Sequence, residues 1–231
     1  MSQRIQFQRP DGASVSGHLA EAAEPLGAVV VIQEWWGVND QIRGVAERFA
    51  SAGFTALVPD LYRGKSTVEA EEAEHLKGDL DFADAAAQDI RGALLHLKAL
   101  GLGSGKVGIT GYCMGGALTW LAAQQSPEAD AAVVWYGMPP LKAIDAARLK
   151  LPVQAHWATQ DEFFAIDQVD ALEARLKEAG ASYEGHRYLA RHAFANETAQ
   201  GAGRIPQTQY DAAWAQQAWD RAMRFFGQHL G

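Results

Sequence analysis

The chain has little cysteine and no long apolar run. Cys113 is its only cysteine in 231 residues, so no disulfide can form within the chain. No apolar run approaches the length needed to span a bilayer, and residues 1–6 contain no apolar signal segment. These absences predict a cytoplasmic protein without a membrane partner.

Clustered basic residues and metal-ligand motifs are also missing. The chain has 20 Lys and Arg against 28 Asp and Glu, a net charge of -8, and no block of basic residues. Nucleic acids and anionic membrane surfaces are bound mainly through such blocks. The 7 histidines are scattered, without the compact spacing of a metal site. We therefore expect a small-molecule partner, no nucleic acid and no metal.

Apolar sequence is plentiful, at 48% of residues, which is enough for a large core. Short apolar runs alternate with longer stretches of helical periodicity, and this alternation is typical of an α/β protein. We expect one domain over residues 1–231, a three-layer sandwich in which helices cover both faces of a mostly parallel central sheet. The predicted strands are 5–9, 14–20, 28–32, 55–58, 106–110, 131–136, 153–157 and 183–189; the predicted helices are 40–52, 83–100, 114–125, 166–179 and 207–230. The acidic stretch 66–81 is expected to be a surface loop or short helix.

Cys113 stands between Gly111 and Gly115, after a predicted strand and before a predicted helix. A sharp turn from strand to helix strains the backbone at its central residue and leaves no room for side chains two positions away. The positive end of the following helix dipole also favours a thiolate at that residue. A lone cysteine is more often a small buried hydrophobe, but this setting predicts a nucleophile.

Two later residues are candidate partners of Cys113. Asp161 and His192 each follow a predicted strand, in the order nucleophile, acid, base that is found on sheets of this kind. An imidazole keeps a thiol ionised and protonates the leaving group, while a carboxylate orients the imidazole. Alone, Asp161 would be read as a helix cap and His192 as a surface or core residue. Glu162 is the alternative acid.

Acyl transfer also needs backbone N–H donors for the oxyanion. The N–H of Met114 follows the nucleophile, and we expect the second donor from Trp35, in the loop after the strand 28–32. Glu34 precedes Trp35 beside the sheet core, where a carboxylate needs a hydrogen-bond partner.

Four motifs together resemble the dienelactone hydrolase family of α/β hydrolases, over nearly the whole chain. They are Gln-Glu-Trp-Trp-Gly-Val-Asn at 33–39, Pro-Asp-Leu-Tyr at 59–62, Gly-Tyr-Cys-Met-Gly-Gly at 111–116 and His-Ala-Phe at 192–194. The resemblance implies an α/β-hydrolase fold and a cofactor-free, generally monomeric hydrolase of a lactone or ester, of the carboxymethylenebutenolidase type. It implies a triad of Cys113, Asp161 and His192, oxyanion donors at Trp35 and Met114, and Glu34 holding the resting thiol.

The residues expected to bind substrate depart from the family pattern. Two arginines are expected to clamp the carboxylate of a dienelactone. Asn196 stands where one of them is expected, four residues after His192, and Glu71 aligns with the other. Arg63, Arg191 or Arg204 would have to act from another direction. The remaining substrate-binding candidates are aromatic and suit an aromatic or cyclic ester, although packing alone would explain most of them: Trp35, Trp36, Tyr62, Phe163 and Phe194.

Two other functions remain open from the sequence. One is a broader carboxylesterase or thioesterase, which a substrate panel distinguishes from a dienelactone hydrolase. The other is a binding or redox-sensing protein on a hydrolase fold, in which Cys113 holds a ligand or is oxidised without turnover.

Overall fold

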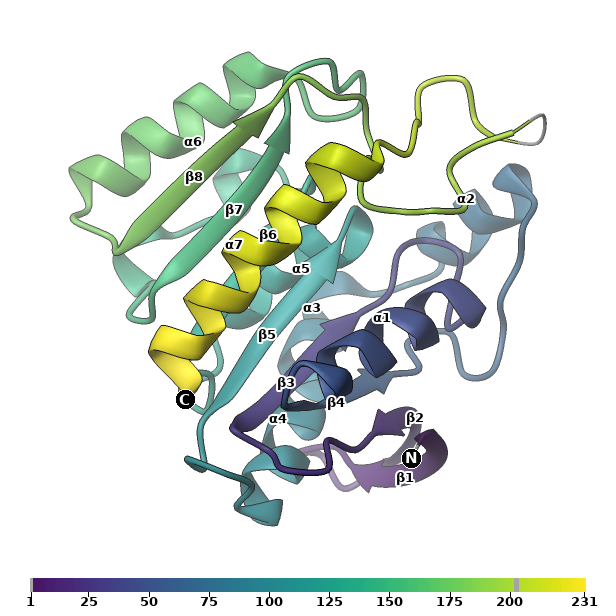
Figure 1. Cartoon of the computed structure of the whole chain (residues 1–231), viewed down its shortest axis with the longest axis vertical. Coiled ribbons are helices and arrows are strands. Elements are labelled where there is room, and N and C mark those ends of the chain that lie inside the picture. Colours follow the sequence, from purple (N-terminus) through teal and green to yellow (C-terminus); the bar gives the residue numbers. More distant parts are fainter. Residues whose placement is uncertain (1, 202–203) are drawn as a thin grey trace.

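The computed structural model describes residues 2–201 and 204–231, which form an 8-stranded sheet between two layers of helices (Figure 1). The strands are β1 (Ser2–Gln8), β2 (Ser14–Ala20), β3 (Gly27–Ile32), β4 (Phe54–Pro59), β5 (Val107–Tyr112), β6 (Ala131–Trp135), β7 (Val153–Ala158) and β8 (Tyr183–Tyr188). Their order is β1-β2-β4-β3-β5-β6-β7-β8, with β2 antiparallel to both neighbours and parallel pairing from β4 to β8. The mostly parallel α/β fold is thus confirmed.

Five central strands are buried along their whole length: β3, β4, β5, β6 and β7. Their near-continuous apolar sequences are what a parallel sheet covered on both faces requires. The outermost strands β1 and β8 are largely exposed or partly exposed instead, with one buried residue each.

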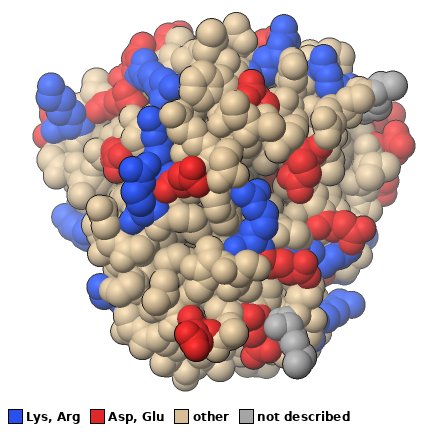
Figure 2. Space-filling view, viewed as in Figure 1, with Lys and Arg blue, Asp and Glu red and all other residues tan. Residues whose placement is uncertain are grey.

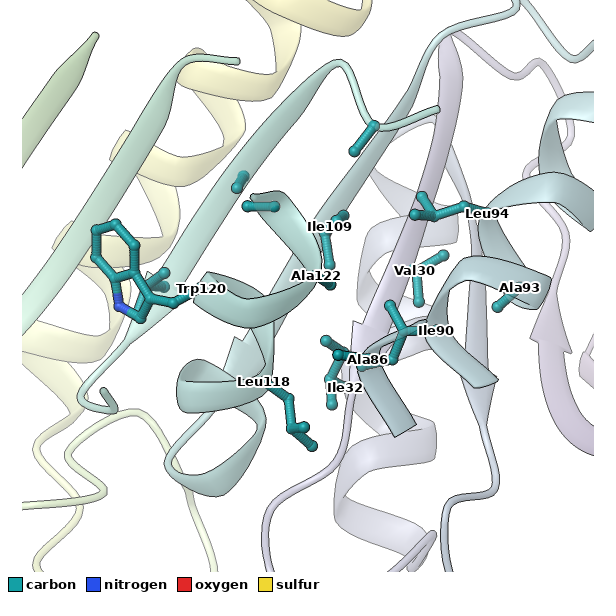
Figure 3. Close-up of a cluster of buried hydrophobic side chains, with 14 of the residues drawn as sticks. Val30, Ile32, Ala86, Ile90, Ala93, Leu94, Ile109, Leu118, Trp120 and Ala122 are labelled. Carbon is teal, nitrogen blue, oxygen red and sulfur yellow. The ribbon is translucent and has the colours of Figure 1, made fainter. Parts of the chain in front are cut away.

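One face of the sheet is covered by α1 (Asp40–Ser51) and α7 (Ala212–Leu230), and the other by α4 (Arg91–Leu100), α5 (Met114–Ala123) and α6 (Ile166–Glu178). Figure 3 shows part of the hydrophobic core on the face that α4, α5 and α6 cover. There Val30, Ile32 and Ile109 of the sheet pack against Ile90, Leu94, Leu118 and their neighbours. Two shorter helices, α2 (Ala70–Gly78) and α3 (Phe82–Asp84), precede α4 along the chain. The expected short helix within 66–81 is therefore present.

The helix predicted over 83–100 is not uniform. Residues Ala85–Ile90 form a π-helical segment between α3 and α4. Within it Asp89 is buried and bonds to Arg9 and Arg63, an arrangement that periodicity does not reveal.

The helix predicted from 207 begins later, because Asp211 caps α7 by accepting the N–H groups of Ala213 and Trp214. Thr208 instead forms a β-bridge to His192. The chain just before α7 therefore packs beside the loop that follows β8.

The topology brings two strand ends together. The chain adds β4 on one side of β3 and then returns to place β5 on the other side. The carboxyl ends of strands at such a reversal form the usual ligand-binding place of an open α/β sheet. Ile32 pairs with Gly111, so Glu34 and Cys113 leave the sheet from adjacent strands. No helix in the described part of the chain is both long and apolar enough to cross a membrane.

Candidate active site

Cys113 occupies a strained turn between β5 and α5. Its φ is 54° and its ψ is -115°, a conformation that L-residues rarely adopt, and its side chain is partly exposed. Its N–H donates to Trp135 O at 3.0 Å, which ties the turn to β6. The strand-turn-helix setting predicted from the sequence is confirmed.

The glycines around Cys113 are needed because the backbone is crowded there. A Cβ on Gly111 would lie 2.1 Å from Gly115 O, and a Cβ on Gly115 would lie 2.4 Å from Ile32 O. Neither distance is tolerable for carbon, so side chains are excluded at both positions. Gly137, after β6, is a third such position, since its Cβ would lie 1.9 Å from Cys113 O.

His192 and Asp161 meet at the ends of β8 and β7. His192 Nδ1 lies 2.7 Å from Asp161 Oδ2, and both side chains are buried. The other oxygen of Asp161 accepts the N–H groups of Phe163 and Phe164 in a turn, but no helix begins there: α6 starts at Ile166 after Ala165, so Asp161 is not a helix cap. Glu162, the alternative acid, is exposed and faces Arg191 instead.

Cys113 and Asp161 determine the charge state of His192. Burial by itself lowers the pKa of this imidazole, but the charge and hydrogen bond of Cys113, together with Asp161, raise it to about 10. His192 therefore lies between a sulfur and a carboxylate, and its protonated form is favoured at neutral pH.

Glu34 is buried beside these groups, and its hydrogen bonds with the described side chains come from neutral donors. Tyr136 donates its hydroxyl to Oε1 at 3.2 Å, and Asn196 Nδ2 donates to Oε2 at 2.9 Å. Burial raises the pKa of this carboxyl, although His192 and the two hydrogen bonds act in the opposite direction. Two hydrogen-bond donors, Tyr136 and Asn196, thus satisfy this buried carboxyl group.

The two residues expected to donate to an oxyanion lie on adjacent segments. Met114 is the first residue of α5, in the turn where helix N–H groups have no partner within the helix. Trp35 follows Glu34 after β3, and its side chain packs against the core on the face of the sheet that α4, α5 and α6 cover. The first turn of α5 is in close contact with this strand end, as the crowding at Gly115 shows.

Three of the predicted substrate-binding side chains, Trp36, Tyr62 and Phe163, lie beside the reacting groups or their immediate neighbours. Phe163 is 48% exposed with its ring 4.9 Å from that of His192, and Trp36 meets the edge of Trp35 at 5.0 Å. Tyr62 is buried and reaches the site through its hydroxyl, 3.3 Å from Met114 Sδ.

Phe194 and Asn196 do not present a surface to a substrate. Phe194 is fully buried and packs on Tyr136 and Tyr188, so it is a core residue. Asn196 is 2% exposed, with its amide bonded to Glu34 and its oxygen accepting from Thr198. Their predicted role as substrate contacts is not supported, because their polar and aromatic groups are used within the protein.

Sequence reasoning missed Tyr136 and Phe164. Tyr136 has a positive φ of 35°, bonds Glu34, and sets its ring edge-on to His192 at 5.1 Å. Phe164 packs against the same imidazole at 5.7 Å. The position of Tyr136 directly after the buried strand β6 was the available signal, because the carboxyl ends of the central strands converge on the site.

Metal binding has no support in the geometry. Across residues 2–201 and 204–231, no three His, Cys, Asp or Glu side chains are arranged to hold a metal ion.

The sheet order and the turn at Cys113 define an α/β hydrolase. Residues 15–230 match the model of the dienelactone hydrolase family. Among curated relatives, protein usf of Aquifex pyrophilus is 32% identical over the full length of both chains. A protein of Escherichia coli K12 with the provisional name carboxymethylenebutenolidase is 31% identical, over 90% of this chain and 79% of its own. The chain belongs to the dienelactone hydrolase family.

Solved structures agree with this assignment. A protein of Klebsiella pneumoniae, provisionally named a dienelactone hydrolase, superposes with a TM-score of 0.79 at 26% identity, covering 99% of this chain and 100% of that one. An esterase of Thermogutta terrifontis shares the fold at 18% identity, with a TM-score of 0.70 and coverage of 98% and 94%.

Proposed function

We propose that the protein hydrolyses a lactone or carboxylic ester by covalent catalysis at Cys113, with His192 as acid and base and Asp161 as the group that orients it. The observation that carries this proposal is the position of His192, which contacts both Asp161 and the sulfur of a strained strand-to-helix turn. The provisional name carboxymethylenebutenolidase denotes a lactone hydrolase and supports this class of substrate.

The reaction has two steps. The Cys113 thiolate attacks the carbonyl carbon, and the oxyanion accepts hydrogen bonds from the N–H groups of Met114 and Trp35. Collapse of this intermediate breaks the ester bond, His192 protonates the leaving alkoxide, and a thioester remains on Cys113. Water, deprotonated by His192, then attacks the thioester, releases the acid and leaves the Cys113 thiolate beside protonated His192, as at the start.

Glu34 serves the resting enzyme in this scheme. When Cys113 carries its proton, the carboxylate accepts a hydrogen bond from the thiol; transfer of that proton to His192 gives the thiolate and imidazolium that react with the substrate. Tyr136 and Asn196 hold that carboxylate in place from the side of the core.

Substitution of the nucleophile tests the proposal. In Cys113→Ala, we expect turnover of phenyl acetate and of dihydrocoumarin to fall by at least about a thousandfold, because the covalent route is lost. The near-UV circular dichroism and the melting temperature should stay close to wild type, since a small, partly exposed side chain is replaced by a smaller one. Retained turnover in this variant would refute the proposal.

A further inference from the structure

A small cavity lies between β2 and the start of α1. Its lining comes from β1, β2, α1 and the loops that follow β3 and β4, and its volume is about 160 Å³. None of the reacting groups lines it, so it is separate from the site at Cys113. Since a water molecule takes up about 30 Å³, the cavity has room for a small ion and a few waters.

The cavity is rich in positive charge, because three basic side chains line it: Arg4, Arg43 and Lys65. Arg4 donates to the hydroxyl of Ser16 through Nη2 at 3.1 Å, and its Nη1 and Nε make no hydrogen bond among the described residues. Lys65 is exposed and has no hydrogen-bond or ion-pair partner in the described part of the chain. Both side chains therefore have N–H groups to give to a ligand.

Arg43 is partly used within the protein. It donates to Val38 O through Nη1 at 2.9 Å and pairs with the exposed carboxylate of Asp40 through Nη2, which leaves Nε. Asp60 is the one acidic residue in the lining. Three cations thus face one carboxylate, and an anion is the ligand that this charge favours.

A larger cavity at the other end of α1 has the opposite character. Glu21, Glu24 and Glu47 line it, without any Lys or Arg among its described lining residues. The positive charge is therefore a property of the smaller cavity and not of the whole surface along α1.

Two buried polar atoms of the smaller cavity's lining residues lack a partner. They are His18 Nε2 and Asp60 Oδ1, neither of which has a hydrogen bond among the described residues. Asp60 is 7% exposed, and its other oxygen accepts from the hydroxyl of Ser16 at 3.2 Å. A buried polar atom without a partner is costly. A ligand that satisfies both atoms must accept a hydrogen bond from an imidazole and donate one to a carboxylate.

Hydrogen phosphate can do both, because it has acceptor oxygens and keeps a P–OH group. Sulfate and carboxylates accept hydrogen bonds but have no proton to donate at neutral pH. A tetrahedral ion also suits cations that approach from several elements, whereas a planar carboxylate is best matched by one guanidinium fork.

We propose that this cavity binds inorganic phosphate, with its P–OH directed to Asp60 Oδ1. The three basic side chains supply the charge, and the binding does not depend on hydrolysis at Cys113. The loops after β3 and β4 already meet in the β-bridge of Gly37 and Ser66, and a bound ion connects them further. Phosphate therefore also raises the melting temperature.

NMR titration of the His18 ring protons with inorganic phosphate tests the proposal, at about pH 8 and constant ionic strength, with the signals assigned by their loss in His18→Gln. At this pH inorganic phosphate keeps one P–OH, whereas sulfate and glycerol 1-phosphate have none. We expect a saturable shift with a Kd of about 1 mM or less, and binding of the other two ions that is weaker by at least about tenfold. The absence of a saturable shift, equal binding of sulfate, or tighter binding of the monoester would overturn the proposal.

Variants identify the residues that hold the ion. Arg4→Gln should raise the Kd for phosphate by at least about fivefold, whereas the control Arg148→Gln, on the surface before β7, should leave it within about twofold. Turnover of phenyl acetate should be unchanged in Arg4→Gln, so the result is independent of the proposed hydrolase function. An unchanged Kd in Arg4→Gln would overturn the proposal.

Asp60→Asn tests the selectivity for phosphate. It should bring the Kd values for phosphate and sulfate within about threefold of each other, because an amide does not require a P–OH donor. A preference for phosphate as large as that of the wild type would overturn the role of Asp60. Near-UV circular dichroism checks the fold of this variant; if it does not fold, the comparison of phosphate with sulfate in the wild type decides the same question.

Discussion

Asp161 shows why single residues of the site were partly predictable from the sequence. The sequence allowed two interpretations, a helix cap and a triad acid. In the structure one oxygen contacts His192, while the other accepts N–H groups of a turn at Phe163 rather than of a helix, because α6 begins only at Ile166. The order of Cys113, Asp161 and His192 along strand ends was enough to place them together. Tyr136 could not be assigned this way, because its contact with Glu34 joins residues 102 positions apart.

The raised pKa of His192 has a measurable consequence. Because this pKa, about 10, lies above the ordinary 6.5, the fold stabilises the imidazolium. That contribution is complete below about 6.5 and is lost as the pH rises through about 10. We expect kcat/KM to decline over the same alkaline range, since the leaving group loses its acid.

Ring-proton NMR titration of His192 checks the cause. In Cys113→Ala, the pKa should fall clearly below the wild-type value, because the charge and hydrogen bond of the sulfur are removed while burial remains. The same pKa in both proteins would show that Cys113 does not act on His192.

Tyr136 offers a second test at this scale. Tyr136→Phe removes the hydroxyl from Glu34 Oε1 and leaves the ring against His192. We expect the free energy of unfolding to fall by about 1–3 kcal/mol, the usual cost of a buried acceptor that loses its donor. The acidic limb of the pH profile should move to higher pH, because this hydrogen bond lowers the pKa of Glu34.

Tyr183→Phe is the matched control, since Tyr183 also bonds a carboxylate, that of Glu173, but away from the site. A pH profile that shifts equally in both variants, or in neither, would contradict a positioning role for Tyr136.

Among the elements, the turn from β5 to α5 was the most predictable. The Gly-x-Cys-x-Gly pattern reports steric crowding within the turn itself, and the structure shows that crowding at Gly111 and Gly115. The π-helical segment Ala85–Ile90 was not predictable, because it is associated with contacts of Asp89 to arginines that lie far away in the sequence.

Gly137 extends the crowding to β6. Gly137→Ala would place a methyl group 1.9 Å from Cys113 O, so we expect a shifted turn, a lower melting temperature and a large loss of turnover. Gly44→Ala, in the middle of α1, is the control: its Cβ meets nothing within 4 Å. There we expect unchanged turnover and a gain of about 0.5–1 kcal/mol. Full activity of Gly137→Ala would contradict the geometry.

The ion cluster at Asp89 connects three elements. Asp89 is 1% exposed and contacts Arg9, which follows β1, and Arg63, which follows β4. Asp89→Ala leaves two arginines without this partner and should lower the free energy of unfolding by about 3–5 kcal/mol, the usual cost of breaking a buried pair. Urea unfolding measures the change, with Asp79→Ala on the surface as control; equal effects in the two variants would contradict the role of the cluster.

At the scale of the whole molecule, the net charge and the mostly parallel sheet could be predicted from the sequence, but the strand order and the pairing of the charged side chains could not. Figure 2 shows acidic and basic side chains interspersed on the face viewed, with no continuous basic patch among its described residues. The sheet could be predicted because strands that are buried on both faces have nearly unbroken apolar sequences. The pairing of cations with carboxylates depends on contacts between loops that are distant in the sequence. The positions of Arg63, Arg191 and Arg204 relative to the site therefore could not be predicted from the sequence.

The central claim, covalent catalysis at Cys113, is tested most directly by rapid-quench mass spectrometry during a single turnover of phenyl acetate. The account predicts a transient mass increase of one acetyl group, located on the peptide that contains Cys113 and absent from Cys113→Ala. Turnover without such an adduct, or an adduct on another residue, would contradict it.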